Sequence, residues 1–561
     1  MNLLNDTFIK AHGLNARRIR LHQRRIVQAL RNEINTDIPI QNPCTVESGS
    51  IISWEIATKA LQSTHSTKSA EQNEYQKWQK NHVVSCIPAA GAASRFFVEC
   101  QHFVNYTREQ LEHGLELEIT SMLVQFPFLD RLIQQVTNTD ILNANTILAA
   151  YAFSRTLIEK YSSQPKLNVP ATNEGDTFLK LKMEEQAHLF PCLGSTLVVP
   201  FAMKKQIQDI LYQLKPKEYE KWLVLEQDHK LSTIRFLRNG EPYLDDKGQY
   251  SIVSAGHGEL LHLFDNIADH FTQAHCLHIR NIDNIIGNNV QRKEEINTPI
   301  HLFYKLRTAL ELIRKIIPLI DFNTVNELHD KELMEQLSFI SQLTQMDPAV
   351  EPRDDNIKPR DDKNKISPTE FYHLFAKLFH WQDLPNNLTH AQIWKLILEN
   401  SERPLSVFAV VKKEKGDVGG GPIFAKVSDG SIVKLCMEMP HASPEDAKEY
   451  FSDRGKTTHF NPALAFFEIK THTYTAINTG KKVNFVQLFD ERFWLLTKRE
   501  YKGTPVCYHE TVLYELIGNS ATTNLVFIEV PRSLFKPHKS YLDCLEHNRE
   551  SYGFNKNFEP G

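Results

Sequence analysis

Residues 83–95 read Val-Val-Ser-Cys-Ile-Pro-Ala-Ala-Gly-Ala-Ala-Ser-Arg, and this stretch indicates the fold of the chain. The run from Val83 to Ile87 is apolar and predicts a buried strand. The small residues after it would let backbone N–H groups and the Arg95 side chain approach an anion such as a triphosphate. The loop is not a Walker A motif, because no Gly-Lys-Ser or Gly-Lys-Thr follows it. A packing turn between strand and helix is the alternative interpretation.

The sequence on the C-terminal side of this loop alternates strand-like and helical patterns. Between residues 198 and 286, apolar runs alternate with amphipathic segments, which is typical of βαβ units and a mostly parallel sheet. The stretch 346–366 repeats Pro-Arg-Asp-Asp without apolar periodicity, so it predicts a linker. We expect an α/β fold with a Rossmann-like, mixed and mostly parallel sheet. Its expected parts are a helical N-terminal extension (1–80), a nucleotide-binding α/β core (81–345), the linker, and a helix with a strand-rich part (367–561).

Two capping patterns predict where helices begin. Thr107-x-x-Gln110 precedes a run of leucines and predicts a helix that starts at Thr107. Ser367-Pro368-x-Glu370 predicts a second helix start, with proline at the first helical position.

Composition restricts the class of function. The 561 residues include 64 Lys and Arg against 68 Asp and Glu, and the net charge of -4 argues against a nucleic-acid partner. The eight cysteines form no CxxC pair, which predicts buried free thiols in a reducing cytoplasm. The sequence contains no apolar run long enough to span a membrane and no signal-peptide core. We therefore expect a cytoplasmic protein, although specialised export stays open.

An arginine cluster lies near the N-terminus, at positions 17, 18, 20, 24 and 25. Its helical spacing favours a solvated helix face over contact with an anionic surface.

Two further elements suggest ligand contacts. Ala255-Gly256-His257-Gly258-Glu259 precedes a helical pattern, so the backbone could pass close to a ligand while His257 donates or accepts a hydrogen bond; an ordinary turn explains it equally well. Asp283 follows the apolar run Cys276-Leu-His-Ile279, and the carboxyl end of a strand is where an α/β sheet presents functional groups. One such carboxylate suffices for Mg²⁺ beside phosphate oxygens, whereas the alternative is a capping or turn aspartate.

These elements, in this order, resemble the uridylyltransferase family of sugar-1-phosphate pyrophosphorylases, which has the nucleotide-diphospho-sugar transferase fold. Members of that family have a glycine-rich LAGGxGTR-like loop, a GNG or GHG turn and a VDN strand end. The C-terminal part continues the likeness with Gly419-Gly420-Gly421-Pro, with His459-Phe-Asn-Pro462 and with a segment ending in Phe535-Lys-Pro-His-Lys539. The chain also resembles an uncharacterised bacterial family with PAAGAASR, GHG, NIDN, GGGP, THFNP and FIEVP signatures. The likeness covers about residues 82–545.

The resemblance implies a Mg²⁺-dependent transfer of a nucleoside monophosphate, UMP from UTP, to a sugar 1-phosphate with release of pyrophosphate. It implies catalytic roles for Arg95, Asp283 and Lys539, with Asp283 as the metal ligand, and contacts from Glu438 and Asn461 to sugar hydroxyls. The implied nucleotide-binding residues are Ala90, Gly91, Ala92, Ser94, Gln227, Gly256, His257 and Gly258.

One departure concerns lysine. Many pyrophosphorylases have a lysine soon after the loop arginine, whereas this chain has none between Lys80 and Lys160. Phosphate neutralisation would then depend on Arg95 and Lys539, with Lys412 or Lys413 as further candidates. A non-catalytic nucleotide-binding protein is one alternative that this absence favours. A nucleotide-sugar-dependent glycosyltransferase is another, although the residues after Asp283 provide no paired-acid metal motif.

Overall fold

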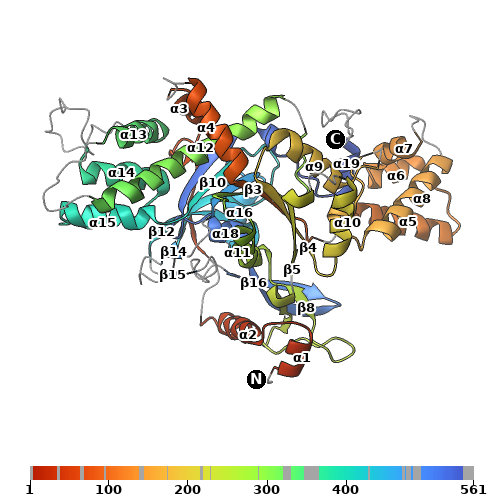
Figure 1. Ribbon diagram of the computed structural model, residues 1–561. Helices are drawn as coiled ribbons and strands as arrows, with labels where there is room; N and C mark the ends of the chain where they lie inside the picture. Colours follow the sequence, from red (N-terminus) through yellow and green to blue (C-terminus); the bar gives the residue numbers. More distant parts are fainter. Residues whose placement is uncertain are drawn as a thin grey trace. The chain divides into compact units, whose positions relative to one another are not determined.

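The protein is an α/β protein with a large, mostly parallel sheet, shown as a ribbon in Figure 1. The computed structural model describes residues 4–546, except 34–37, 64–67, 92, 94–95, 138–143, 173–174, 215–218, 228, 288–289, 320–329, 347–365, 428–429, 470–473, 476–481 and 484–493. Two compact units are present. The first comprises Met1–Val84, Asp228–His278 and Asn297–Pro531, and the second comprises Ser85–Gln227, Ile279–Ile296 and Arg532–Gly561. The expected linker lies almost wholly outside the described residues.

The strand order of the eight-stranded sheet is β2-β18-β10-β13-β9-β3-β4-β5. In the first unit, β18 (Asn524–Val530) runs parallel to both β10 (Leu405–Val411) and β2 (Ile51–Ile52). The neighbouring β13 (Leu464–Glu468) is antiparallel to β10. In the second unit, β4 (Gly194–Pro200) and β5 (Trp222–Gln227) are parallel. The strands β3 (Val83–Pro88) and β9 (Cys276–Ile279) begin in the first unit and end in the second.

The first unit contains helices from several separate segments of the chain. The N-terminal segment forms α1 (Asp6–Ala11), α2 (Ala16–Leu30), α3 (Trp54–Ser63) and α4 (Lys68–His82). Its two short strands pair within the unit, β1 (Ile40–Pro43) with β11 (Gly421–Lys426) and β2 with β18. The remaining helices are α11 (Leu261–His270), most of α12 (Val290–Ile316), α13 (Lys331–Thr344), α14 (Pro368–Phe379), α15 (His390–Ser401), α16 (Pro444–Phe451) and α18 (Leu513–Ile517). The predicted start of α14 is confirmed, because Ser367 and Glu370 form a reciprocal capping box with Pro368 in the first turn.

The strand-rich C-terminal part is also confirmed. Besides the strands of the large sheet, β11 pairs with β12 (Ile432–Met437), and β16 (Trp494–Tyr501) pairs with β17 (Thr504–Thr511). The short strands β14 (Tyr474–Thr475) and β15 (Lys482–Val483) also lie in this part. Three further short strands come earlier in the chain: β6 (Ser232–Ile234), β7 (Phe236–Leu237) and β8 (Ile252–Ser254).

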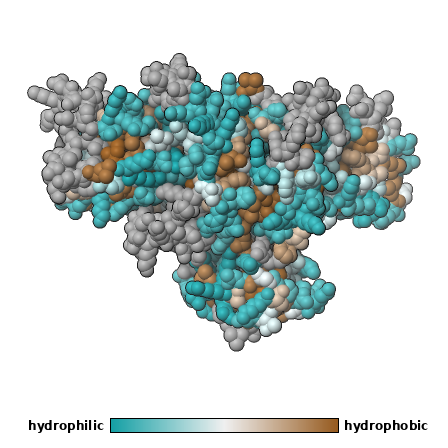
Figure 2. Space-filling view, in the orientation of Figure 1, coloured by the Kyte–Doolittle hydropathy of each residue, from teal (hydrophilic) through white to brown (hydrophobic). Residues whose placement is uncertain are grey.

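The second unit contains a group of helices between β3 and β4. These are α5 (Val98–Glu112), α6 (Ile119–Gln125), α7 (Leu129–Thr137), α8 (Ala144–Tyr161) and α9 (Phe178–Leu189); α10 (Lys204–Leu214) and α19 (Tyr541–Glu546) follow later in the chain. Thr107 does not start a helix, so that prediction is wrong. It lies within α5 with a fully buried side chain, because the helix already begins at Val98. In Figure 2 apolar surface is visible over α5–α8, whose exposed apolar side chains include Leu111 and Val124.

An apolar core lies beneath the ends of β3 and β4 in the second unit. It joins β3 and β4 to α5, α7, α8 and α9, and it includes Ile282 and Ile285 on either side of Asp283. Tyr541 of α19 also belongs to this core, and its N–H donates to the carbonyl oxygen of Phe96. The core therefore fixes the loop after β3, the turn around Asp283 and the C-terminal helix as parts of one unit.

Candidate functional site

Asp283 lies in a turn after β9 and accepts hydrogen bonds from two lysines. Its Oδ2 atom is 3.2 Å from the Nζ atom of Lys166 and 3.2 Å from that of Lys539. The side chains of Asp283 and Lys166 are 14% and 12% exposed, whereas that of Lys539 is 66% exposed. All three residues belong to the second unit. Asp283 and Lys539, two of the residues with predicted catalytic roles, are thus in direct contact, although the segments that carry them are far apart in the sequence.

The two ammonium groups control the charge state of the aspartate. Burial raises the pKa of Asp283, but the positive charges and hydrogen bonds of Lys539 and Lys166 outweigh burial, and the pKa lies below its usual value. Burial lowers the pKa of Lys166, Asp283 raises it and the charge of Lys539 lowers it, and the resulting pKa lies below its usual value. A carboxylate with two cations beside it carries a net positive charge locally. Such a site suits an anion with several negative charges.

Lys166 is a candidate site residue that the sequence analysis missed. Its backbone N–H donates to the carbonyl oxygen of Gly91, and the N–H of Ala93 donates to the carbonyl oxygen of Gln164, at 3.2 and 3.1 Å. These bonds place Lys166 directly beside the loop after β3. Helices α5–α8 separate the loop from Lys166 in the sequence, so a search for a lysine soon after Arg95 does not reach it. The signal that could have found it is the Pro165-Lys166 pair directly after that helical insertion.

The described part of the loop after β3 is fixed at its start and exposed at Gly91. The N–H of Ala89 donates to the carbonyl oxygen of Val198 on β4, which fixes the start of the loop. Gly91 is exposed, and a Cβ atom added there would meet nothing within 4 Å. Ala90 is half-buried beside it. The predicted phosphate-binding residues Ala92, Ser94 and Arg95 lie outside the described residues.

Gln227, predicted to read the base, is the last residue of β5. Its side chain is half-buried, and its partner in the parallel register is Pro200 at the end of β4. The carboxyl ends of parallel strands lie at the same edge of a sheet, so Gln227 and the loop after β3 share one edge of the second unit.

The Gly256-His257-Gly258 turn belongs to the first unit and packs against the end of β17. Gly256 has a φ of +99°, and a Cβ atom there would lie 2.3 Å from the carbonyl oxygen of Thr511. A Cβ atom on Gly258 would lie 2.6 Å from the Thr511 side chain. Both glycines are therefore required by close approach of the protein to itself. The exposed side chain of this turn is His257.

Glu438 and Asn461 lie together in the first unit, around Gly420. A Cβ atom on Gly420 would lie 2.8 Å from Cα of Glu438 and 3.0 Å from Nδ2 of Asn461. The N–H of Asn461 donates to the carbonyl oxygen of Gly420 at 3.2 Å, and the N–H of Glu438 donates to Oε1 of the buried Glu515 at 2.8 Å. The structure thus brings the two predicted sugar-binding residues together, with both side chains half-buried.

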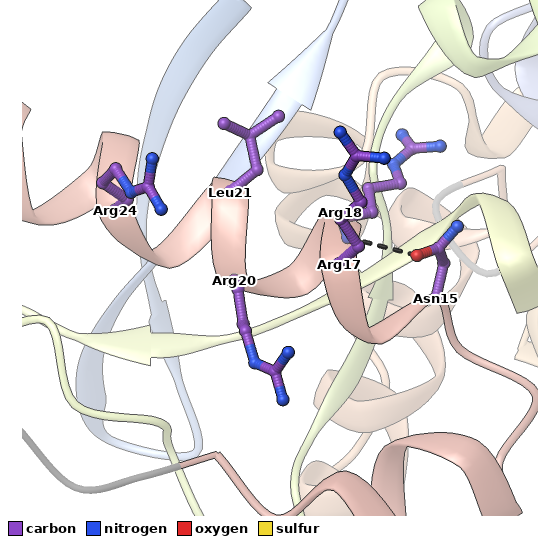
Figure 3. A pocket seen from close by; sticks show the side chains of 6 residues that line it. All are labelled: Asn15, Arg17, Arg18, Arg20, Leu21 and Arg24. Carbon is purple, nitrogen blue, oxygen red and sulfur yellow. Dashed lines mark hydrogen bonds between the residues drawn. The ribbon is translucent and has the colours of Figure 1, made fainter.

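The N-terminal arginines lie on α2 in the first unit. A surface hollow there is lined by four of them, Arg17, Arg18, Arg20 and Arg24, with Asn15 and Leu21 (Figure 3). Arg20 points away from Leu21 and forms an ion pair with Asp6, and Arg18 forms an ion pair with Glu259. The guanidinium groups fan out around the helix and do not converge on one point (Figure 3). The exposed Arg17, Arg20 and Arg24 fit the solvated helix face that the spacing favours. Arg18 and Arg25 do not, because they are half-buried and contact the buried residues Glu259 and His509.

One oxygen of Asp283 could hold Mg²⁺, whereas its other oxygen bonds two ammonium groups that oppose a cation there. Its Oδ1 atom is buried and has no hydrogen-bond partner within the described ranges. Mg²⁺ is commonly held by one or two carboxylates together with phosphate oxygens and water. Among the described residues no group of three His, Cys, Asp or Glu side chains could hold a metal ion. Asp283 would therefore be a single protein ligand, with the rest of the coordination sphere supplied by substrate and solvent.

Comparisons with known proteins give three results. A family model described as a domain of unknown function, DUF4301, matches residues 360–550. Comparison with curated proteins gives no match. Among solved structures, the chain is similar to a UDP-glucose phosphorylase from Trypanosoma brucei, with 12% identity, a TM-score of 0.47 and coverage of 96% of this chain and 76% of that chain. It is also similar to a variant UDP-glucose pyrophosphorylase from Leishmania major in complex with UDP-glucose, with 12% identity, a TM-score of 0.44 and coverage of 96% and 77%.

Structural likeness at this level does not establish a function.

No described helix is long and apolar enough to cross a membrane. Of the eight cysteines, all are free thiols; seven are buried and Cys192 is half-buried, as predicted.

Proposed function

We propose that the chain is a nucleotidyltransferase that transfers UMP from UTP to a sugar 1-phosphate and releases pyrophosphate. The observation that supports this most is the convergence of Lys166 and Lys539 on Asp283, beside the open Gly91 loop. Phosphoryl and nucleotidyl transfer require little covalent work from a protein, and positioning with charge neutralisation provides most of the acceleration. Two lysines next to a glycine-containing loop are suited to that task.

In the proposed reaction, an oxygen of the sugar phosphate attacks the α-phosphorus of UTP in line. The new P–O bond forms as the bond to the β-phosphate breaks, and pyrophosphate leaves with that electron pair. The nucleophile is already ionised at neutral pH, so no general base is needed. Lys166 would neutralise charge on the triphosphate next to the loop, and Lys539 would do so as the second phosphate approaches.

The other residues have supporting roles in this proposal. The N–H groups of the loop with Gly91, Ala92, Ser94 and Arg95 would hold the triphosphate, and Gln227 would bind the base. Mg²⁺ bound by Asp283 would supply charge neutralisation at the phosphates. In the first unit, His257, Glu438 and Asn461 are the candidates for contacts to the nucleoside and the sugar. Free, mostly buried thiols fit a cytoplasmic location.

Lys166 weakens the case for a non-catalytic protein. That alternative depended on a missing lysine near the loop, and Lys166 occupies such a position in space. A glycosyltransferase stays a competing function because it would use the same nucleotide-binding residues.

One assay separates these functions. The protein is incubated with Mg²⁺, each nucleoside triphosphate and a panel of sugar 1-phosphates, and pyrophosphate is measured. We expect pyrophosphate only when a sugar phosphate is present, and most with UTP. Cleavage of a UDP-sugar on addition of a sugar acceptor, without pyrophosphate, would instead establish a glycosyltransferase. Nucleotide binding without either product would establish the non-catalytic alternative.

A further inference from the structure

Asn284 connects the turn that carries Asp283 to the C-terminal segment that carries Lys539. Its side chain is buried; Nδ2 donates to the carbonyl oxygen of Leu534 at 3.1 Å, and Oδ1 accepts from the N–H of Lys536 at 2.8 Å. The backbone continues this pairing with an antiparallel bridge between Asn284 and Pro537. The N–H of His538 then donates to the carbonyl oxygen of Asp283 at 2.9 Å. One amide side chain thus provides two of the bonds that align the segments.

Asn284 is itself held by buried charges on its other side. Its carbonyl oxygen accepts from Nζ of Lys182 at 2.5 Å and from Nη2 of Arg280 at 2.7 Å. Arg280 also forms an ion pair with Glu185, whose Oε2 atom accepts from the N–H of Ile286 at 3.0 Å. The three charged side chains are at most 2% exposed. Because a buried charge that loses its partner is costly, this network favours one conformation of the turn.

The contact between Lys539 and Asp283 is too weak to hold the C-terminal segment by itself. The Lys539 side chain is 66% exposed, and ion pairs exposed to solvent contribute little to stability. A long, flexible side chain also loses conformational freedom when it is held in one place. The position of its ammonium group therefore depends on the backbone that carries it. That backbone is held by Asn284 together with the hydrogen bonds that His538 forms with Asp283 and Lys166.

We propose that Asn284 is a positioning residue, whose side-chain amide fastens the segment 534–539 to the Asp283 turn and thereby holds the Lys539 ammonium beside the Asp283 carboxylate. Its effect on turnover rests on the proposed nucleotidyltransferase function. Its effect on the position of the segment is independent of that function, and turnover and segment mobility are measured separately.

A double-mutant cycle tests the effect on turnover. Asn284→Asp keeps the acceptor for the Lys536 N–H and removes the donor to Leu534. We expect it to lower kcat roughly tenfold, which is the size of effect that one buried hydrogen bond can produce. If Asn284 acts through Lys539, the same substitution in a Lys539→Ala background should cost less than about twofold. A full tenfold loss in both backgrounds would show a general structural role and overturn the proposal.

Amide hydrogen exchange tests the fastening without any activity. In Asn284→Asp, the N–H groups of Lys536 and His538 should exchange at least about tenfold faster, because the local opening of the segment becomes easier. Asn281→Asp is the matched control, since Asn281 is exposed on the same turn, and its exchange and turnover should equal those of the wild type. Asn284→Ser replaces the aspartate variant if that variant does not fold. Unchanged exchange at both amides would overturn the proposal; faster exchange in a protein without turnover would reject the proposed function and leave the fastening intact.

Discussion

The Asp283 turn of the second unit and the glycine turns of the first unit both contain predicted site residues, but they are built in opposite ways. Around Asp283, charged side chains from three separate segments meet, and Gly91 beside them faces open space. Around Gly256 and Gly420, backbone approaches backbone so closely that a Cβ atom would overlap carbonyl oxygens at 2.3 and 2.2 Å. A glycine-rich signature can therefore indicate room for a ligand or the absence of room for a side chain. The sequence pattern is the same in both cases.

The largest expected effect comes from Asp283. Asp283→Asn should lower kcat by at least about a hundredfold, because it removes the carboxylate that aligns two lysines and the one described ligand candidate for Mg²⁺. It also leaves the mostly buried Lys166 without its counter-charge, so the free energy of unfolding should fall by about 1–3 kcal/mol. Steady-state kinetics and denaturant unfolding measure the two effects. A folded variant with normal turnover would remove Asp283 from the mechanism.

A pair of glycine substitutions tests the contrast between the two regions directly. Gly256→Ala should destabilise the protein by about 2–4 kcal/mol, because of its left-handed φ and the overlap with Thr511. Gly91→Ala should leave stability within about 0.5 kcal/mol, since the added methyl group meets no atom, but should weaken UTP binding by occupying the proposed phosphate site. Thermal unfolding and calorimetric titration with UTP measure these outcomes. Equal destabilisation by both substitutions would erase the distinction between the regions.

The two lysines should differ in their contribution. Lys166→Met removes the charge that is nearest the loop and mostly buried, so we expect kcat to fall by about a hundredfold. Lys539→Ala removes a charge that is largely exposed, so the loss should be nearer tenfold. Arg20→Ala on α2 is the control and should leave both kcat and UTP affinity unchanged. A larger loss in Lys539→Ala than in Lys166→Met would reverse the assigned importance.

The smallest expected effects are opposite pH dependences of stability in the two units. The pKa of Asp283 is lowered in the folded state, so its contribution is present above its unfolded value near 3.8 and is lost as the pH falls below it. Burial lowers the pKa of His441, but the charge and hydrogen bond of Glu515 outweigh burial and the pKa is raised. Its contribution is therefore present below pH 6.5 and is lost as the pH rises through the folded value.

His441→Gln isolates the second of these pH effects. Compared with this variant, the wild type should lose about 1 kcal/mol of unfolding free energy between pH 6 and pH 9. Denaturant unfolding across that range measures the difference. Parallel curves for the two proteins would show that the His441–Glu515 pair carries no charge-dependent stability.

Local patterns in the sequence predicted local structure well where backbone and near neighbours decide it. The strand at 83–88, the alternation of strands and helices after it and the capping box at Ser367 all follow from apolar periodicity or from a hydrogen bond over three residues. The Thr107 prediction was wrong because a local pattern does not show how the segment packs in the folded protein. The sequence does contain the capping pattern, but Phe103 and Thr107 are buried in the second unit. Because of this packing, α5 continues through Thr107 and does not begin there.

The sequence by itself determined the α/β class, the strand-rich C-terminal part and the identity of Asp283 and Lys539 as candidates for one site. Their direct contact agrees with that expectation. Only the tertiary structure decided that Lys166 joins them and that Asn284 aligns their segments, because both depend on contacts between positions more than a hundred residues apart. Tertiary structure also decided how much space surrounds each glycine: a Cβ atom on Gly91 would meet no atom, whereas one on Gly256 or Gly420 would overlap the backbone. The space around a residue depends on what the rest of the chain brings to it, and no local pattern contains that information.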